Sequence, residues 1–293
     1  MGTPKVSIII SVFEQLTYTQ KCLEKLEGTL DGVITYEVII IDDASKDGTK
    51  EFLLSLKPPY RIFLNSTNKG FAQNNNFAAK EAKGEFLCFL NNDVFVSGNW
   101  LLPMIDVFKS KENVGMVGNV QRLANSWRYD HMGMVFSPQG IPCHYGQGFF
   151  RRPFQGEVRQ WSAVTAACCV TAKKTFHLNG SFDEIFVNGC EDVDLCLRMS
   201  KNGLNHYVVH DSEVSHIKGA SEGRKIFNDR NTEFLMKRWS GDITIQQSID
   251  DQYKYAWTYF CRAFVKPLTF EFRRWVESVL ILLRLRKLIL PKS

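Results

Sequence analysis

Oxygen-bearing side chains follow a short apolar run near the end of the first third of the chain. Residues 86–90 read FLCFL, and Asn91, Asn92 and Asp93 come directly after them. An unbroken apolar run of this length predicts a buried strand. Carboxylate and amide oxygens can hold a divalent cation, and that cation can in turn hold phosphate groups. The same residue types also form ordinary turns, so this cluster alone leaves both interpretations open.

Two more polar clusters occupy comparable places in the first half. Asp42 and Asp43 follow an apolar run, and Asn68, Gly70 and Asn74 lie at the start of a predicted helix. The two carboxylates could accept hydrogen bonds from a nucleoside, and a glycine lets backbone approach a ligand closely. Asn74 opens a run of three asparagines, of which we expect at least one on a solvated helix face.

The elements that must position these clusters alternate along the first half. Buried strands are predicted at 6–13, 37–41, 61–65, 86–90 and 115–119, with helical patterns between them. That alternation is typical of an α/β fold with a doubly wound, mostly parallel sheet flanked by helices. Right-handed crossovers bring the ends of such strands to one edge, which is where open α/β sheets bind ligands. We therefore expect the three clusters to converge.

The second half offers a carboxylate pair and a histidine. Glu191 and Asp192 begin a predicted amphipathic helix, where a carboxylate could be a general base or simply a favourable charge at the helix start. Asp194 and Arg198 have the i, i+4 spacing of a helical ion pair. His216 follows a strand-like stretch and could be a metal ligand or a structural residue. Residues 161–171 predict one further strand.

Composition excludes several classes of protein. The net charge of +5 over 293 residues is mild, so we expect no nucleic-acid partner. Eight scattered cysteines without a C-x-x-C pair favour reduced thiols over disulfides or a zinc site. The chain has neither a G-x-G-x-x-G nor a P-loop motif, which makes a metal the simplest way to hold phosphates. A strand close to the N-terminus leaves no room for a signal peptide, and no apolar stretch reaches about 18 residues, so we expect a cytoplasmic protein.

The first strand, together with the motifs at 42–49, 68–72 and 90–93, resembles the family 2 glycosyltransferases, which have the GT-A (Rossmann-like) fold. The resemblance implies an inverting, metal-dependent enzyme of glycan or polysaccharide synthesis. Its donor would be a nucleotide-diphosphate-sugar, expected to be a UDP- or dTDP-sugar, and its acceptor a hydroxyl of a saccharide or a lipid-linked glycan. The form Asn91-Asn92-Asp93 retains only the last carboxylate of the family's D-x-D motif and is similar to the branch containing bacterial rhamnosyltransferases.

The resemblance also implies roles for individual residues. Asp192 is expected to be the general base, with Glu191 as the alternative. Asp93 and His216 are expected to bind Mg²⁺ or Mn²⁺. The positions expected to contact the donor are Ser11, Phe13, Glu14, Asp42, Asp43, Asn68, Gly70, Asn74, Asn91 and Asn92.

We expect a catalytic domain at 1–241, with a nucleotide-sugar-binding half at 1–120 and an acceptor and catalytic half at 121–241. Residues 242–293 then form a basic helical extension. Two rival functions remain at this point. A sugar nucleotidyltransferase would need a basic phosphate-binding loop early in the chain, and none is visible. An inactive sugar-binding or scaffold protein is compatible with the loss of D-x-D carboxylates.

The extension is predicted to contain helices at 250–264 and 268–290, separated at Pro267. The second has an apolar stripe that includes Phe272 and Leu283 and a basic opposite side. Such a helix could lie on the inner face of an anionic membrane as a peripheral contact. It could equally pack on the catalytic domain or on a partner.

Overall fold

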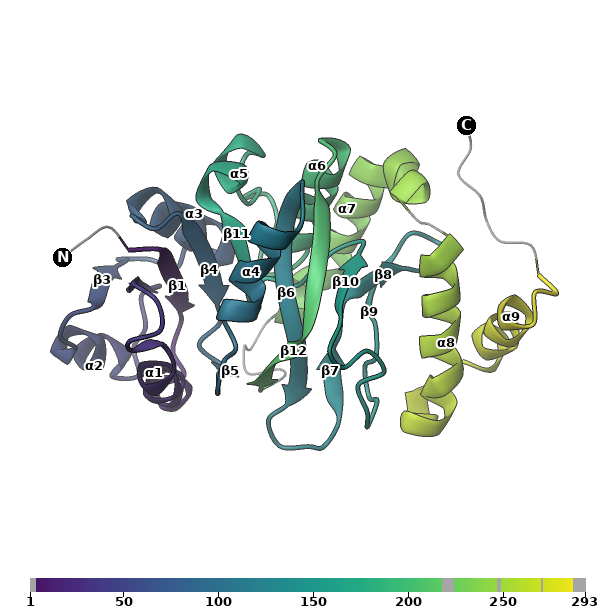
Figure 1. Cartoon of the computed structure of the whole chain (residues 1–293), viewed down its shortest axis with the longest axis horizontal. Helices are drawn as coiled ribbons and strands as arrows, with labels where there is room; N and C mark the ends of the chain where they lie inside the picture. The colour runs from purple at the N-terminus through teal and green to yellow at the C-terminus, as the bar shows by residue number, and fades with distance from the viewer. Residues whose placement is uncertain (1–3, 218–223, 247–248, 270, 287–293) are drawn as a thin grey trace.

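A ten-stranded mixed sheet runs through the molecule in the order β10-β12-β6-β11-β4-β1-β2-β3, with β5 and β7 on its margin. The computed structural model describes residues 4–217, 224–246, 249–269 and 271–286 (Figure 1). The strands are β1 (Val6–Val12), β2 (Tyr36–Asp42), β3 (Tyr60–Leu64), β4 (Phe86–Leu90), β5 (Val94–Phe95), β6 (Val114–Leu123), β7 (Tyr129–His131), β10 (Val158–Trp161), β11 (Cys168–Ala172) and β12 (Asn205–His216).

The expected parallel array is confirmed in the first half and becomes mixed in the second. β1 pairs parallel with β2 and β4, and β2 with β3. β11 is antiparallel to both of its neighbours, β4 and β6, so those two strands run in the same direction. β12 is parallel to β6. The carboxyl ends of β1, β2, β4, β6 and β12 therefore share one edge.

Alternate side chains of β1 enter two separate cores, which is why helices cover both faces of the sheet (Figure 1). Ile8 and Ile10 pack with residues of α1, α2 and α4. Ile9 packs with residues of α3, α5, α6 and α7. The helices are α1 (Leu16–Leu30), α2 (Thr49–Ser55), α3 (Gly70–Glu81), α4 (Leu102–Ser110), α5 (Lys173–Leu178), α6 (Glu191–Lys201) and α7 (Arg224–Gln246).

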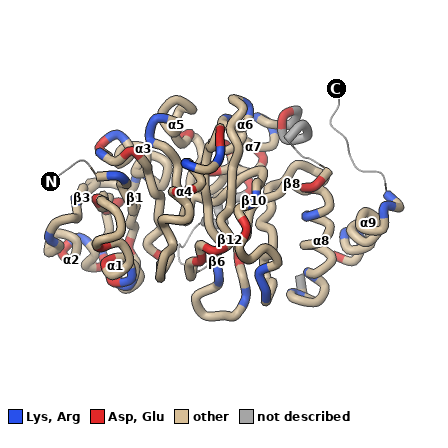
Figure 2. The backbone as a smooth tube through the Cα atoms, viewed as in Figure 1, with Lys and Arg blue, Asp and Glu red and all other residues tan. Residues whose placement is uncertain are grey.

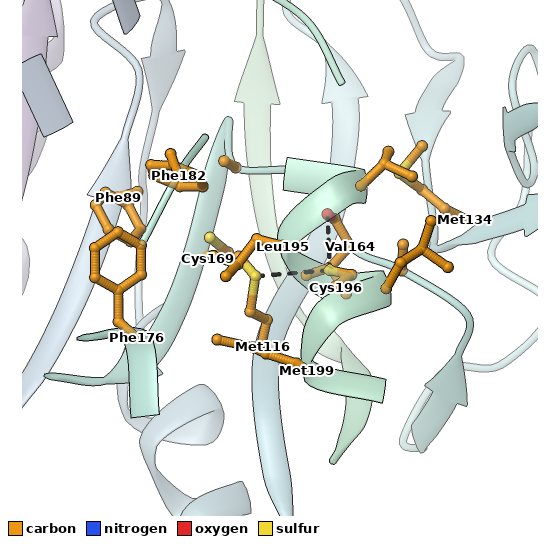
Figure 3. Packing of buried hydrophobic residues seen from close by; sticks show 14 of the residues in the cluster. Phe89, Met116, Met134, Val164, Cys169, Phe176, Phe182, Leu195, Cys196 and Met199 are labelled. Atoms are coloured by element: carbon orange, nitrogen blue, oxygen red, sulfur yellow. Dashed lines mark hydrogen bonds between the residues drawn. The ribbon is translucent and has the colours of Figure 1, made fainter. Parts of the chain in front are cut away.

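The core beneath α6 joins the two halves of the chain (Figure 3). The Phe89 ring of β4 lies 4.9 Å from Phe182 and 5.1 Å from Phe176, measured between ring centroids. The Cys196 thiol of α6 lies 3.6 Å from the Met116 sulfur of β6. This apolar packing fixes the position and orientation of α6 on the sheet, and α6 carries the predicted catalytic carboxylates.

Two local expectations were wrong. The single strand predicted at 161–171 is two strands, β10 and β11, because residues 162–167 leave the sheet between them. All three asparagines at 74–76 are buried, whereas at least one was expected in solvent. Their amides bond inside the protein: Asn75 donates to the Phe71 carbonyl and Asn76 to the Phe182 carbonyl. All eight cysteines are free thiols, as predicted.

The C-terminal part consists of α8 (Ile249–Val265), a short 3₁₀ turn (Pro267–Thr269) and α9 (Phe272–Leu282). α8 packs on β8 (Met134–Phe136), and α9 packs on α8, with the Trp275 and Phe260 ring centroids 5.8 Å apart (Figure 1). Arginine positions occur along α9 and in the turn after it (Figure 2).

The extent predicted for the helix at 268–290 is wrong within the described residues. α9 ends at Leu282, and Arg284 has a positive φ of 59° that stops the helix. The described part of the predicted stripe faces outward at both ends, since Phe272 is 69% exposed and Leu283 is also exposed. Residues 287–290 lie outside the described residues. Within the described residues, none of the helices combines the length and apolarity needed to cross a bilayer.

Candidate active site

The predicted site residues lie at the edge of the sheet where β1, β2, β4 and β12 end (Figure 1). Asp42 is the last residue of β2, and His216 is the last residue of β12. Asn91 follows β4 directly. The edge therefore collects groups from sequence positions that are far apart, as the parallel strands require.

Asp93 and His216 form a buried pair at this edge. The Asp93 Oδ2 lies 3.5 Å from His216 Nε2, and the two residues are 8% and 6% exposed. β5 brings them together, because Val94 pairs with His216 and the Ile217 amide donates to the Asp93 carbonyl at 2.9 Å. The Asp93 Oδ1 is buried and has no hydrogen-bond partner among the described residues. A carboxylate oxygen in that state is suited to a cation.

Asp130 supports this pair from the other side of the imidazole. Its Oδ2 lies 3.9 Å from His216 Nδ1, while its Oδ1 accepts a hydrogen bond from Gln147 Nε2 at 3.3 Å. That separation is longer than a hydrogen bond, and the buried His216 Nδ1 has no hydrogen-bond partner among the described residues. A carboxylate that bonds the second ring nitrogen can orient a metal-binding histidine. No three acidic, histidine or cysteine side chains of the described residues surround one point. Asp130 was missed because β7, the three-residue strand that carries it, has no motif in the sequence.

Asp43 organises the start of α3. Its Oδ1 accepts the Lys69 amide at 2.8 Å and the Asn65 side-chain amide at 2.9 Å. Its Oδ2 accepts the Gly70 amide at 2.9 Å. Three donors on one buried carboxylate hold the loop in place, and Gly70 has a positive φ of 81° that suits glycine.

The other donor-side residues surround this loop. The Asn65 side chain also donates to the side-chain Oδ1 of Asn74 at 2.7 Å, whereas the buried Asn74 Nδ2 has no hydrogen-bond partner among the described residues. Asp42 is buried and its Oδ1 accepts the Ser45 amide at 3.2 Å. Asn68 is exposed. The two aspartates thus shape the backbone, which leaves Asn68 and the loop amides closest to solvent.

The turn between β1 and α1 is held in an uncommon backbone conformation. Glu14 and Gln15 in this turn have positive φ values of 54° and 61°, and Ala44 in the loop after β2 has one of 67°. The Glu14 amide donates to Ser45 Oγ at 2.7 Å, which fastens this turn to the end of β2. Non-glycine residues with positive φ gather at functional sites when the surrounding structure enforces them. Ser11 is half-buried and Phe13 is exposed beside them.

The Asp47 carboxylate connects the first residues of α1 and α2 through hydrogen bonds. Its Oδ1 accepts the Thr49 amide and hydroxyl, and its Oδ2 accepts the Leu16 amide at 2.9 Å. Burial opposes the charge, but these hydrogen bonds outweigh it and hold the pKa of Asp47 below its usual range. Asp47 therefore satisfies backbone donors at the starts of both α1 and α2.

The predicted base, Asp192, is held by backbone amides near the Asp93–His216 pair. Asp192 Oδ2 accepts the Ala166 amide at 2.9 Å, and its Oδ1 accepts the Val193 amide at 2.8 Å. The next residue, Ala167, accepts the Asn91 amide on its carbonyl at 2.9 Å. The two residues before β11, Ala166 and Ala167, therefore connect Asp192 to the turn that carries Asp93.

The remaining predicted residues of this edge have partners too. Glu191 is buried, and its Oε2 accepts the Gly189 amide at 2.7 Å. Asn92 donates to Thr19 Oγ1 of α1 at 3.0 Å. Glu191 is consequently more enclosed than the half-buried Asp192, which favours Asp192 as the group that meets a substrate.

Two asparagines outside the predicted set connect the donor loop to α6. Asn188 Oδ1 accepts the Phe71 amide at 3.2 Å. Asn231 of α7 donates to the carbonyls of Val187 and Gly189 at 2.8 and 2.9 Å. Sequence reasoning missed both, because nothing in their local pattern distinguishes them from surface asparagines.

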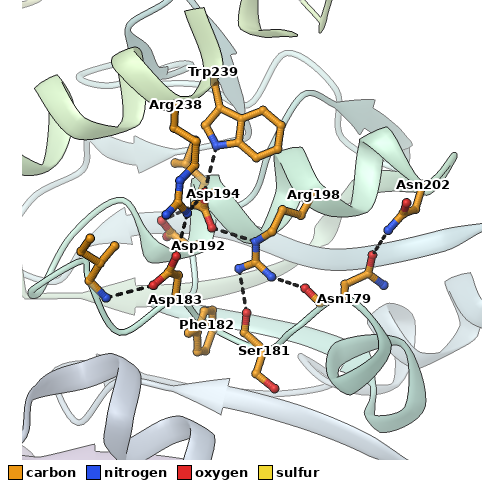
Figure 4. A network of polar contacts seen from close by, with 12 residues as sticks. Asn179, Ser181, Phe182, Asp183, Asp192, Asp194, Arg198, Asn202, Arg238 and Trp239 are labelled. Carbon is orange, nitrogen blue, oxygen red and sulfur yellow. Dashed lines mark hydrogen bonds and ion pairs between the residues drawn. The ribbon is translucent and has the colours of Figure 1, made fainter.

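Beneath α6, Asp194 is the centre of an ion-pair network (Figure 4). It is fully buried and pairs with Arg198 at 2.8 Å, as predicted, and with Arg238 at 2.9 Å. The Trp239 indole donates to its Oδ1 at 2.9 Å. α7 is thereby locked to α6, and the position of Asp192 at the start of α6 depends on this anchor.

Comparison with known proteins places this edge in a family. The model of glycosyl transferase family 2 matches residues 7–174. The chain is 28% identical over 259 residues to the uncharacterized protein y4gI of Sinorhizobium fredii, covering 81% of this chain. It is 29% identical over 228 residues to the O-antigen biosynthesis protein RfbC of Myxococcus xanthus, covering 75% of this chain. It spans only 28% of y4gI and 18% of RfbC.

Two solved structures share the fold. The crystal structure of GalNAc-T7 with UDP, GalNAc and Mn²⁺ superposes with a TM-score of 0.66 at 16% identity, covering 94% of this chain and 54% of that one. The mannosyltransferase PcManGT from Pyrobaculum calidifontis, in complex with GDP-Man and Mn²⁺, gives 0.57 at 14% identity, covering 97% and 81%. With the family model matching more than half of its length, this chain belongs to glycosyl transferase family 2 and has the GT-A fold.

Proposed function

We propose that this chain is an inverting, metal-dependent glycosyltransferase of glycan or polysaccharide synthesis. It transfers a sugar from a nucleotide-diphosphate donor to a hydroxyl acceptor. The observation that carries the proposal is the buried Asp93–His216 pair, joined through the backbone at Ala166 and Ala167 to Asp192. The names of the structural neighbours, which include UDP, GDP-Man and Mn²⁺, support the same chemistry.

Asp93 and His216 would hold Mg²⁺ or Mn²⁺, and the unpartnered Asp93 Oδ1 fits that role. A metal bound there would offset the negative charge that develops on the leaving diphosphate. Asp130, whose Oδ2 is 3.9 Å from His216 Nδ1, would orient the imidazole with Nε2 toward the metal if it closed to hydrogen-bond distance on metal binding. Such a ligand set is incomplete by itself, which suits a site that shares its cation with a phosphorylated donor.

Asp192 acts as the general base in this proposal. Both of its oxygens accept a backbone amide, and each keeps a lone pair for a substrate hydroxyl. As the acceptor oxygen attacks the anomeric carbon, Asp192 takes its proton. The bond from that carbon to the diphosphate breaks on the opposite side, and the electron pair leaves with the nucleotide, so the configuration inverts. Glu191 is the alternative base.

The donor would lie along the loops that end β1, β2 and β4. In this proposal Ser11 of β1, Phe13 and Glu14 in the loop after it, and Asp42 at the end of β2 would contact the nucleoside of a UDP- or dTDP-sugar. Asn68, Gly70, Asn74, Asn91 and Asn92 complete that edge. The strained turn at Glu14 supports this, because its conformation is maintained by Ser45 of the neighbouring loop.

We also propose the division into a catalytic part, 1–241, and an extension, 242–293. α7 crosses this boundary, and its helical geometry breaks at Trp239, with φ of −112° and ψ of 15°. A lipid-linked acceptor would bring the extension close to a membrane surface. A saccharide acceptor would not require that contact.

Nucleotide release from UDP-, dTDP- and GDP-sugars, measured with Mn²⁺, Mg²⁺ or EDTA, tests the proposal. We expect slow hydrolysis of one donor, lost in EDTA. The same assay with sugar 1-phosphates and nucleoside triphosphates detects the nucleotidyltransferase rival by pyrophosphate release. If neither turnover nor calorimetric nucleotide binding is found, the proposal of an active enzyme is contradicted. The alternative of an inactive sugar-binding or scaffold protein would then remain.

A further inference from the structure

A hollow of about 240 Å³ lies between α8 and the hairpin of β8 and β9 (Pro142–His144). This is below the range of roughly 300–1,000 Å³ common for drug-sized ligands, so it suits one small group of a larger molecule. Its lining consists of Val135, Pro142, Cys143, His144, Gln147, Tyr255, Thr258, Tyr259, Arg262 and Lys266.

The charges of this lining have one sign. Arg262 is in the last turn of α8, and Lys266 follows the helix directly, with its amide donating to the Arg262 carbonyl at 2.9 Å. Both side chains line the hollow. Among the described lining residues no carboxylate occurs. Burial raises the pKa of the Cys143 thiol to about 11, and the positive charges of Arg262 and Arg274 act in the opposite direction. The hollow is thus a region of positive potential.

The hollow also contains a hydroxyl suited to a ligand. Thr258 Oγ1 is buried and has no hydrogen-bond partner among the described residues. Such a group is uncommon in a folded protein and calls for a partner. The rings of Tyr255 and Tyr259 stand 6.0 Å apart on the same helix and add an aromatic wall. Cations, a hydroxyl and aromatic rings together match a phosphorylated saccharide.

A line of contacts connects the hollow to the proposed metal site. Lys266 Nζ donates to Gln147 Oε1 at 3.1 Å, and Gln147 Nε2 donates to Asp130 at 3.3 Å. Asp130 in turn faces His216, the neighbour of Asp93. Moreover, the Gly148 backbone packs against Val265 at the end of α8. In Figure 1, α8 lies at the opposite end of the molecule from β1 and β2, whose ends carry the proposed donor loops.

We propose that this hollow anchors the acceptor by binding a phosphoryl group that the acceptor carries. Arg262 and Lys266 pair with the phosphate oxygens, and the Thr258 hydroxyl donates to one of them. The role in acceptor binding rests on the proposed transferase function, whereas the binding of phosphate does not. The helical extension is then a part of the substrate site and not only a covering of the sheet.

Calorimetric titration with inorganic phosphate tests the site in EDTA and without nucleotide, so that the proposed donor site is not engaged. We expect saturable binding by the intact chain and at least about tenfold weaker binding by the Arg262→Gln/Lys266→Gln double variant, since two charge-assisted hydrogen bonds are lost. Arg273→Gln is the matched control, because it removes a charge whose side chain is 92% exposed and should bind like the parent.

A second variant protects the test against misfolding. Thr258→Val keeps both cations and the shape of the side chain, and we expect binding about two- to tenfold weaker. Thermal unfolding of each variant identifies any that is not folded. No binding by the intact chain, or equal binding by the folded double variant, would overturn the proposal.

Two further arms separate the sources of the phosphate. Glucose 1-phosphate represents a soluble acceptor phosphate, and phosphatidylcholine vesicles with and without phosphatidylglycerol represent a lipid headgroup. Binding that the double variant loses in either arm supports the site and names the source. Donor hydrolysis is measured in parallel: if it is retained in the double variant, the catalytic proposal stands independently, and if the intact chain lacks it, that proposal fails independently.

Discussion

The Asp93 carboxylate and the His216 imidazole approach to 3.5 Å from opposite halves of the chain. The approach depends on two-residue strand β5, whose Val94 pairs with His216 at the end of β12. Without β5 the two residues would be far apart, because β4 and β12 are separated in the sheet by β11 and β6. The turn after β4 therefore crosses the sheet edge to complete the pair.

Replacing Asp93 by alanine should abolish Mn²⁺-dependent nucleotide release while leaving the fold intact. Its Oδ1 has no partner among the described residues, so little internal hydrogen bonding is lost. The measurement is a metal titration of donor hydrolysis, with Asp106→Ala as a control at an exposed carboxylate of α4. An unchanged titration in Asp93→Ala would remove this residue from the metal site.

Asp130→Asn should weaken metal binding without removing a proposed ligand. The carboxylate faces His216 Nδ1, and loss of such an orienting group lowers metal affinity by about 10–100-fold. Calorimetry with Mn²⁺ measures the affinity, and the turnover at saturating Mn²⁺ should recover largely. Turnover that stays low at every Mn²⁺ concentration would contradict a positioning role.

Asp192→Asn should lower transfer by about 10²–10⁴-fold, the usual contribution of a general base, while nucleotide binding survives. The side chain keeps its place at the first turn of α6 because α6 is anchored through Asp194. Initial rates and nucleotide affinity are compared with those of Glu191→Gln. Full activity in Asp192→Asn with loss in Glu191→Gln would transfer the role to Glu191.

Asp43→Asn should lower the free energy of unfolding by roughly 1–3 kcal/mol. An amide nitrogen in place of either oxygen would face the amide of Gly70 or of Lys69, leaving a buried donor unsatisfied. Urea denaturation measures the change. If stability stays the same and only donor affinity falls, the carboxylate contacts the donor and does not hold the loop.

Stability should fall as the solution is acidified from about pH 6.5 to pH 4. Burial lowers the pKa of His206 from 6.5 to about 4, against the opposing hydrogen bond to the Cys196 carbonyl. The unfolded chain therefore binds this proton more readily within that window, and the loss for this group is roughly 3 kcal/mol. Urea denaturation at several pH values, compared with His206→Gln, checks it: the variant should show the shallower dependence on pH.

Local sequence patterns were sufficient for the parallel strands and for the edge where they end. The apolar runs of β1, β2 and β4 are buried on both faces, so they show no alternation and stand out from helical patterns. Parallel order with right-handed crossovers then requires Asp42 and Asn91 to lie at the same edge. The absence of a C-x-x-C pair predicted the free cysteines, and the i, i+4 spacing predicted the Asp194–Arg198 ion pair, so both also follow from local patterns.

Only the tertiary structure decided which of these polar groups form hydrogen bonds within the protein and so stabilise the fold. Asn74, Asn75 and Asn76 read as a polar helix face, yet the packing of α3 buries all three. Asp130, Asn188 and Asn231 bind partners far away in the chain, so no spacing indicates them. Burial and hydrogen bonding depend on which elements meet and in what register, and that is set by the whole chain packing at once, not by neighbours along the sequence.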